Sequence, residues 1–320
     1  MKKILLVLIG LLLVGCAKTS EQPKESKEKV KVGVIQFAEH VALDRAREGF
    51  VEELKTLGVD ADVEVVNVQA DMGLIPTTAK KFEGQGVDLI YAIATPAAQG
   101  AQSAVGDIPI IFNAVTDPES AELVATNEKP GANVTGVSDY FSVDTQLSKF
   151  LELFPETKSI GILYSTGEVN SEAQIKQIKE FADKKGIEIV AQGLSSTNDV
   201  AQAITALVPK IDAYFAIQDN LASSAATTIS KVLMENKIPS LAGEEGPVEN
   251  GMLLTDGIDY NVLGQEAAKI AKKIIDGQKP ADIPVVFLED STRVVNKTTT
   301  QALNMSDKKD LFEGAKEVSN

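Results

Sequence analysis

The chain has 320 residues and a formal net charge of −15, with 46 acidic against 31 basic side chains. This balance argues against nucleic-acid recognition, which needs clustered Lys and Arg to neutralise phosphates. Hydrophobic residues make up 44% of the chain, and its one cysteine excludes an internal disulfide. We therefore expect one large or two ordinary globular domains that stand on their hydrophobic cores.

The N-terminus predicts export and a membrane anchor. Two lysines precede an apolar run that ends at Val14, which is typical of a secretory signal and too short for a transmembrane helix. The Leu-Val-Gly sequence before Cys16 resembles a bacterial lipobox, in which the cysteine carries the lipid. We expect a signal peptide at 1–15, lipidation of Cys16 and a flexible tether at 16–29, where apolar side chains are almost lacking. The mature protein would be extracytoplasmic, anchored by lipid to the outer face of the bacterial cell membrane.

After the tether, short β-branched runs alternate with longer amphipathic stretches, which is typical of βαβ units and a parallel sheet. The first strand is predicted at 30–36. The helix that follows has apolar residues at helical spacing and stops at Gly58, which accepts a left-handed C-cap. A second strand is predicted at 63–68.

The same order of elements recurs in the second half of the chain. A strand is predicted at 159–164, a helix at 173–185 that stops at Gly186, and a further strand at 187–191. The landmarks that match in order are Gly33 with Gly161, Gly58 with Gly186, Asp88 with Asp212, and Ile108-Pro109 with Ile238-Pro239. We therefore predict an α/β protein of two Rossmann-like lobes, with a ligand cleft between the carboxyl ends of their strands.

Polar residues at the ends of predicted strands are the candidate ligand contacts in the first lobe. The Thr95-Pro96 pair predicts a helix N-terminus, whose free amides and dipole suit a carboxylate. A plain helix cap is the alternative. Thr116, Asp117 and Gln36 occupy the other strand ends. His40, the single histidine, is more typical of a hydrogen bond at a helix start than of a catalytic base.

The second lobe offers Tyr164, Asn170 and Ser171, Asp219 with Asn220, and Glu244. The repeat aligns Asp219 with Thr95, so a carboxylate would face a hydroxyl and amide cluster across the cleft. An α-amino acid needs both, although helix capping would also explain Asp219.

Two aromatic residues, Phe37 and Tyr164, are candidates for holding a ring. The alternative is that both are ordinary core residues. Asp259 and Tyr260 are candidates for a hinge that also contacts the ligand, and Tyr260 could instead simply pack at the lobe junction.

Catalytic signatures are missing from the sequence. It has no Cys-x-x-Cys or His-x-x-x-His metal spacing, no glycine-rich phosphate loop and no G-x-S-x-G elbow. We expect no enzyme activity, no cofactor and no metal. An exported hydrolase that uses His40 is the enzyme alternative.

Six segments carry a family resemblance that covers nearly the whole mature chain. They are Gly33-Val-Ile-Gln-Phe-Ala-Glu-His, Ala94-Thr-Pro-Ala-Ala-Gln, Ala114-Val-Thr-Asp-Pro, Asn133-Val-Thr-Gly-Val-Ser-Asp, Ile217-Gln-Asp-Asn and Gly277-Gln-Lys-Pro-Ala-Asp-Ile-Pro. They resemble the ABC-transporter substrate-binding proteins of the tryptophan/tyrosine-binding type. That resemblance implies a type I periplasmic-binding fold, three hinge crossings and no catalysis. One departure, Val41 where the family often has proline, lies beside the pocket and leaves the ligand open.

The resemblance also implies domain bounds and a pocket. The first lobe would comprise 30–137 plus 261–284, and the second 138–260 plus 285–320. The pocket would draw on Gln36, Phe37, Thr95, Pro96, Thr116, Asp117, Asn170, Ser171, Asp219, Asn220, Glu244 and Asp259.

The expected function is that of an extracytoplasmic solute-binding lipoprotein of an ABC importer. It would close on a free amino acid, most often tryptophan, tyrosine or phenylalanine, and deliver it to an ABC permease and its ATPase. We expect a monomer. The alternatives are a branched aliphatic amino acid, a nucleoside-like compound or a vitamin precursor as ligand, and a sensor role for a membrane kinase.

Overall fold

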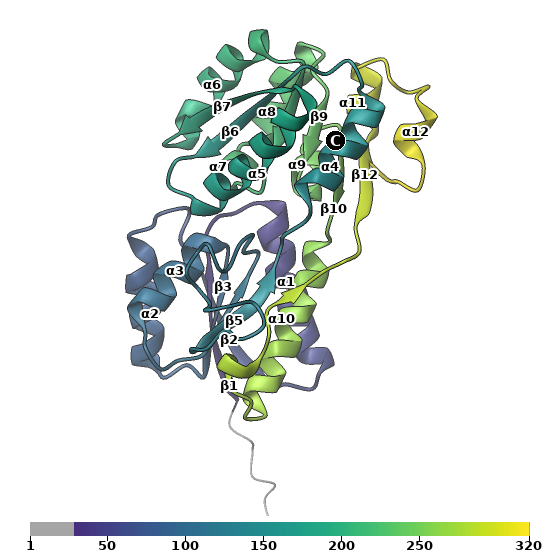
Figure 1. Ribbon diagram of the computed structural model, residues 1–320. Helices are drawn as coiled ribbons and strands as arrows, with labels where there is room; N and C mark the ends of the chain where they lie inside the picture. The colour runs from purple at the N-terminus through teal and green to yellow at the C-terminus, as the bar shows by residue number, and fades with distance from the viewer. Residues whose placement is uncertain (1–28, 320) are drawn as a thin grey trace, which may run out of the picture.

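The computed structural model describes residues 29–319, which form two α/β lobes stacked end to end (Figure 1). The first lobe contains a parallel sheet in the order β11-β5-β4-β3-β1-β2. Its strands are β1 (Val30–Gln36), β2 (Ala61–Asn67), β3 (Leu89–Ile93), β4 (Ile110–Asn113), β5 (Val134–Ser138) and β11 (Val286–Phe287). Segments such as β3 are apolar throughout because both faces of a parallel sheet are covered.

Helices cover both faces of this sheet. They are α1 (Val41–Thr56), α2 (Leu74–Gln85), α3 (Thr95–Ala104) and α10 (Tyr260–Ile275), with the turn η3 (Pro280–Asp282) after them. The purple α1 packs along the yellow-green α10 in Figure 1, although more than 200 residues separate them. Two glycines allow this close approach. A Cβ at Gly49 would lie 2.1 Å from the carbonyl oxygen of Asn261, and one at Gly264 would lie 2.1 Å from that of Ala46.

The second lobe contains a seven-stranded sheet in the order β13-β12-β10-β9-β8-β6-β7. Only the β10–β12 pair is antiparallel among the pairs described. The strands are β6 (Ser159–Ser165), β7 (Glu188–Leu194), β8 (Ala213–Ala216), β9 (Ser240–Ala242), β10 (Leu254–Gly257), β12 (Thr292–Asn296) and β13 (Lys316–Val318). The helices and turns are α4 (Val143–Leu153), α5 (Val169–Lys185), η1 (Thr197–Asp199), α6 (Val200–Leu207), η2 (Val208–Lys210), α7 (Asn220–Ser224), α8 (Ala226–Glu235), α9 (Glu245–Glu249), α11 (Lys297–Ala302) and α12 (Lys309–Phe312).

The predicted two-lobe α/β architecture is confirmed, and the predicted glycine stops are present. Gly58 has a φ of 70° directly after α1 and its cap, and Gly186 caps α5 with a φ of 69°. Each lobe has its own hydrophobic core: one continuous cluster in the first lobe and two clusters in the second.

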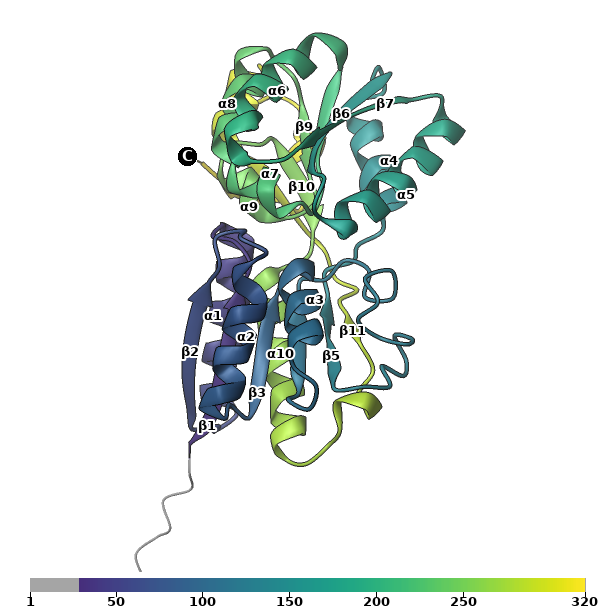
Figure 2. The same cartoon turned by 90° about the vertical axis from the view of Figure 1, so that its left-hand side faces the viewer.

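Three segments connect the lobes in the part of the chain that the structure describes. They run from β5 to α4, from β10 to α10 and from β11 to β12. Figure 2 shows how close together these connections lie at the lobe junction. The lobe limits differ slightly from the predicted bounds. Ser138 belongs to the first sheet, Tyr260 opens a helix of the first lobe, and β11 pairs with β5, whereas we placed 285–320 in the second lobe. A two-residue strand leaves no periodicity from which to predict its sheet.

Cys16, the signal peptide at 1–15 and all of the tether except Lys29 lie outside the described residues. Within 29–319, no helix is long and apolar enough to cross a membrane.

Candidate ligand-binding site

A pocket lies between the two lobes, at the carboxyl ends of their strands. The pocket is narrow in this closed form: about 280 Å³ lies between its atoms, and this volume includes open solvent. Both lobes and the connections line it, through His40, Leu43, Ala114, Asp139, Asn170, Gln218, Asp219, Asn220, Ser223, Glu244 and Tyr260. This position between facing sheets is where open α/β folds bind small ligands.

The lobes contact each other around this pocket. Nε2 of His40, in the first lobe, lies 3.2 Å from Oδ1 of Asn220, in the second. Arg45 on α1 donates to Glu249 on α9 at 2.7 Å and also pairs with Glu245. The cleft is therefore closed, and its walls belong to both lobes.

Two buried carboxyl groups mark the end of the pocket nearest the connections. The Tyr260 hydroxyl donates to Oδ2 of Asp139 at 2.6 Å, while Oδ1 of Asp139 has no partner within hydrogen-bond distance. Glu244 caps α9 by accepting from the Gly246 amide, and its Oε1 has no partner. Burial raises the pKa of Asp139, although the Tyr260 hydroxyl and the nearby Thr116 side chain lower it, and burial raises the pKa of Glu244 to about 8. Each carboxyl thus keeps one buried oxygen without a hydrogen-bond partner in the protein.

The N-terminus of α7 organises the second-lobe wall. Asp219 caps this helix by accepting from the Ala222 amide at 2.8 Å, and its other oxygen accepts from the Ser165 amide and the Ser171 hydroxyl, both at 2.6 Å. Its carboxylate is thus hydrogen-bonded within its own lobe. Burial raises the pKa of Asp219.

Glu168 lies behind this wall and fixes the side chain of Asn220. Its carboxylate accepts from the backbone amides of Asn220 and Leu221, each at 3.2 Å, and from Nδ2 of Asn220 at 2.5 Å. Burial, followed by the nearby charge of Asp219, raises the pKa of Glu168 to about 8. The orientation of the Asn220 amide therefore follows from its contact with Glu168.

Short neutral residues follow strands β3 and β4 of the first lobe, and Ala114 among them lines the pocket, whereas Ala94 and Thr95 do not. Ala94 and Ala114 have φ values of 84° and 55°, a left-handed region that is strained for any residue with a Cβ. Thr95 opens α3, is only 1% exposed, and its hydroxyl has no partner. Such strained, unpaired groups cluster where a ligand completes the structure.

The structure brings four of the predicted site residues together in the pocket: Asn170, Asp219, Asn220 and Glu244. Ser171 supports them through its bond to Asp219. The helix was predicted to begin at 173, but α5 begins at Val169, so Asn170 and Ser171 lie in its first turn.

The other predicted residues lie around the pocket or away from it. Gln36 is buried and bonded within the first lobe, to the Ala38 carbonyl, Asp44 and Arg47. Phe37 belongs to the core of that lobe, where Pro96 is also buried. Thr116 is buried below the Ser138 hydroxyl, which donates to its carbonyl, and Asp117 caps a local turn at Ser120.

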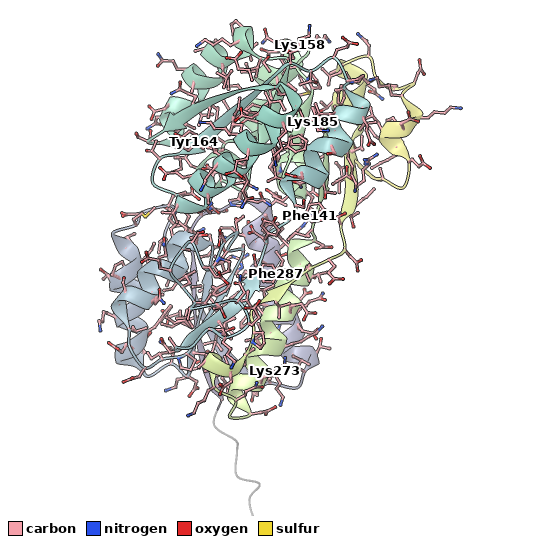
Figure 3. All side chains as sticks on the ribbon, in the orientation of Figure 1. Phe141, Lys158, Tyr164, Lys185, Lys273 and Phe287 are labelled. Atoms are coloured by element: carbon pink, nitrogen blue, oxygen red, sulfur yellow. The ribbon has the colours of Figure 1, made fainter. Side chains whose placement is uncertain are left out.

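Tyr164 and Asp259 are not among the residues that line the pocket. Tyr164 is on the outer flank of the second lobe in Figure 3, opposite Gly193 of the edge strand β7. Asp259 is exposed and caps α10 by accepting from the Asn261 amide.

Sequence reasoning did not select Asp139, Gln218, Ala114, Leu43 or Ser223. Asp139 had a usable signal, because it directly follows a buried strand, as the selected residues did. His40 and Tyr260 were noticed but not included. No group of three or more potential metal-ligating side chains occurs among the described residues.

Residues 31–319 match the family described as ABC transporter substrate binding protein. A tyrosine-binding protein of Clostridioides difficile (strain R20291) is 42% identical over 320 residues, covering 95% of this chain and 93% of the relative. An ABC domain from Streptococcus pneumonia, solved in complex with L-Trp, is 34% identical with a TM-score of 0.86, covering 91% of this chain and 100% of that one.

A third comparison bears on the lobe arrangement. The ligand-free, open structure of a substrate-binding protein with adhesive properties from Clostridium difficile is 43% identical, and the match covers 91% of this chain and 99% of that one. Its TM-score is 0.69, below that of the less identical L-Trp complex. This difference agrees with the closed cleft seen here. The chain belongs to the family of ABC transporter substrate-binding proteins.

Proposed function

We propose that this protein is the lipid-anchored, extracytoplasmic receptor of an ABC importer, and that it binds free tyrosine or tryptophan between its lobes. The family membership and the ligands named for the two relatives support this assignment. Anchoring rests on the lipobox at Cys16, which lies outside the described residues.

The observation that carries the ligand class is the pair of free carboxyl oxygens at Asp139 and Glu244. Both side chains are at most 3% exposed, and no Lys or Arg is among the described residues that line the pocket. Because burial favours the protonated form of such carboxyl groups, a cationic donor in the pocket would stabilise their ionised form. The ammonium of an amino acid supplies that charge and the hydrogen bonds that both oxygens lack. We therefore assign the ammonium to Asp139 and Glu244. Asp219 instead stabilises the second-lobe side of the pocket through its hydrogen bonds within that lobe.

We place the carboxylate of the ligand at the N-terminus of α3, which lies outside the described lining but next to Ala114, since the Ala94 amide donates to the Asn113 carbonyl. This helix has ten residues, and Pro96 near its start leaves its opening turn free for an anion. The unpartnered, buried hydroxyl of Thr95 supplies a further donor. The ligand then contacts the first lobe through its carboxylate and the acidic end of the pocket through its ammonium.

Closure of the lobes follows because the ligand would contact both of them. A ligand held by both lobes binds the closed form more tightly than the open one and shifts the population towards it. The closed form would then dock on the permease, whose ATPase drives transport. The same pocket could serve a sensor, and the transport role is tested by amino acid uptake in cells that lack this protein.

The direct test is binding by a protein that begins at Ala17, unfolded and refolded to remove any ligand carried through purification. Isothermal titration would compare tyrosine and tryptophan with nucleosides and vitamin precursors. We expect the amino acids to bind, and Glu244→Gln or Asp139→Asn to weaken them at least about thirtyfold, because breaking a buried charged pair costs roughly 2–5 kcal/mol. Asp117→Asn, outside the pocket, is the matched control. Binding of a nucleoside but of no amino acid would overturn the ligand assignment.

A further inference from the structure

The pocket has two chemically different ends. The sheet order β9-β8-β6 places Glu244, after β9, near the connections, and Asn170, after β6, further away. Neighbouring strands are spaced by about 4.8 Å, so the two ends lie at most about 10 Å apart, and less where Asn170 reaches back to the Gln218 carbonyl after β8. The near end has the free carboxyl oxygens of Asp139 and Glu244, whereas the free atoms of the far end belong to neutral side chains.

His40 is the first of these neutral groups, and its hydrogen-bond partner sets its tautomer. Nδ2 of Asn220 donates to Glu168, so Oδ1 of Asn220 faces His40 as an acceptor. Nε2 of His40 must then carry the proton. Desolvation lowers the pKa of His40, which keeps the ring neutral. Nδ1, which is buried and has no partner, is consequently a fixed acceptor in the pocket lining.

Asn170 supplies a second neutral acceptor at this end. Its Nδ2 donates to the Gln218 carbonyl at 2.9 Å, which orients the amide. Its Oδ1 is buried and has no partner. The two residues are contributed by different lobes, so a ligand that reaches both would bridge the cleft at its far end as well.

We propose that His40, together with Asn170, determines specificity by accepting a hydrogen bond from the side chain of the ligand. This inference rests on the proposed function and narrows it. The donor would be the phenolic hydroxyl of tyrosine or the indole N–H of tryptophan, because the ammonium occupies the carboxyl end. Phenylalanine and branched aliphatic amino acids would leave both acceptors buried and unpaired. Binding these ligands would therefore cost the hydrogen bonds that the two acceptors make to water in the open form. Sites of this kind reject analogues that lack the donor strongly.

A purely mechanical role for His40 gives a different expectation. If its bond to Asn220 merely held the lobes together, removing it would weaken every ligand by the same factor. Arg45 provides the matched control, since it bridges the lobes through Glu245 and Glu249 and does not line the pocket.

The experiment measures Kd by isothermal titration for tyrosine, tryptophan, O-methyltyrosine and phenylalanine. It uses the wild-type chain from Ala17 and the variants His40→Phe, Asn170→Ala and Arg45→Gln. In the wild type we expect tyrosine or tryptophan to bind at least about a hundredfold more tightly than phenylalanine. If tyrosine is the ligand, O-methyltyrosine should behave like phenylalanine. His40→Phe and Asn170→Ala should each reduce the preference at least about tenfold, whereas Arg45→Gln should weaken all ligands equally and preserve it.

The outcomes separate the two proposals. Equal binding of tyrosine, tryptophan and phenylalanine by the wild type would overturn the specificity role and leave the amino acid receptor intact. An unchanged preference in both pocket variants, with their melting transitions intact, would do the same. If no amino acid binds, the proposed function itself fails.

Discussion

The two lobes share a topology but present different side chains to the cleft. Short neutral residues, among them Ala94, Thr95 and Ala114, follow the strands of the first lobe. Buried carboxyl groups, Glu168 and Glu244 among them, follow those of the second. The features that repeat between the halves are glycine stops and apolar strands, which specify the fold. The strand ends do not repeat, and the two carboxyl groups that keep a free oxygen, Asp139 after β5 and Glu244 after β9, come from different sheets and meet at one end of the pocket.

The lobes also differ in how tightly their helices pack. In the first lobe, Gly49 and Gly264 let α1 and α10 approach until backbone meets backbone. Since α10 starts directly after one connection and α1 carries Arg45, this rigid pair links the connection to the interlobe contact. The three predictions below probe this contrast, from the largest expected effect to the smallest.

The tight helix pair should tolerate no added atom. We expect Gly49→Ala to lower the free energy of unfolding by about 3 kcal/mol, because overpacking a close contact costs roughly 1–3 kcal/mol and here the neighbour is backbone. Gly84→Ala in α2 is the control, since its Cβ meets nothing within 4 Å. It should stabilise the protein by about 0.5–1 kcal/mol. Urea unfolding of both variants checks the pair, and equal effects would contradict the packing argument.

The buried carboxyl groups should make the free energy of unfolding depend on pH. The folded pKa of Glu244 lies at about 8, above its ordinary value of 4.5. Its protonated form therefore contributes stability that is fully present below about pH 4.5 and is lost as the pH rises through about 8. In the ligand-free protein, the free energy of unfolding should fall over this range, with Glu168 contributing in the same direction.

The variant Glu244→Gln isolates the contribution of this one residue. It should flatten the pH dependence by up to about 1.4 kcal/mol per pH unit. Saturating tyrosine should flatten it too, because the ammonium stabilises the ionised carboxyl. Urea unfolding at a series of pH values measures all three slopes. Identical slopes for the wild type and the variant would show that Glu244 does not titrate in this range.

A substitution at the exposed Asp259 distinguishes a role in capping α10 from a role in ligand binding. We expect Asp259→Ala to cost about 1 kcal/mol of stability through loss of the α10 cap. Its ligand Kd should stay within about twofold of the wild type, since the residue is absent from the described pocket lining. If Asp259→Ala weakened ligand binding without lowering the free energy of unfolding, Asp259 would be a ligand contact after all.

Sequence reasoning recovered the fold because its signals are local. Gly186 and the apolar run of β3 each report their own backbone or burial state. Site membership depends instead on where a side chain points after folding. Phe37 continues the pairing of β1 with β3, since its amide donates to the Ile93 carbonyl, and its ring packs within the lobe. Tyr164 occupies the same position in its predicted strand as other candidates but lies beside β7, away from the pocket.

The polar residues illustrate the same limit. Asp219, Gln36 and Asp139 all stand at strand ends, and no spacing rule says which of them keeps a free oxygen. The structure shows that Asp219 and Gln36 have partners within their lobes, whereas Asp139 lies in a connection and keeps one oxygen unpaired. Availability for a ligand is set by neighbours that are distant in sequence.

The unpaired atoms of the closed pocket have a consequence for signal fidelity. When the lobes meet without a ligand, the free oxygens of Asp139, Glu244 and Asn170 are cut off from water with nothing in return. Each such group costs about 1–3 kcal/mol, so together they disfavour spontaneous empty closure by a large factor. A membrane partner that recognises the closed form would thus rarely meet that form without a bound ligand. The same atoms that bind the ligand would therefore keep the partner's ligand-independent activity low.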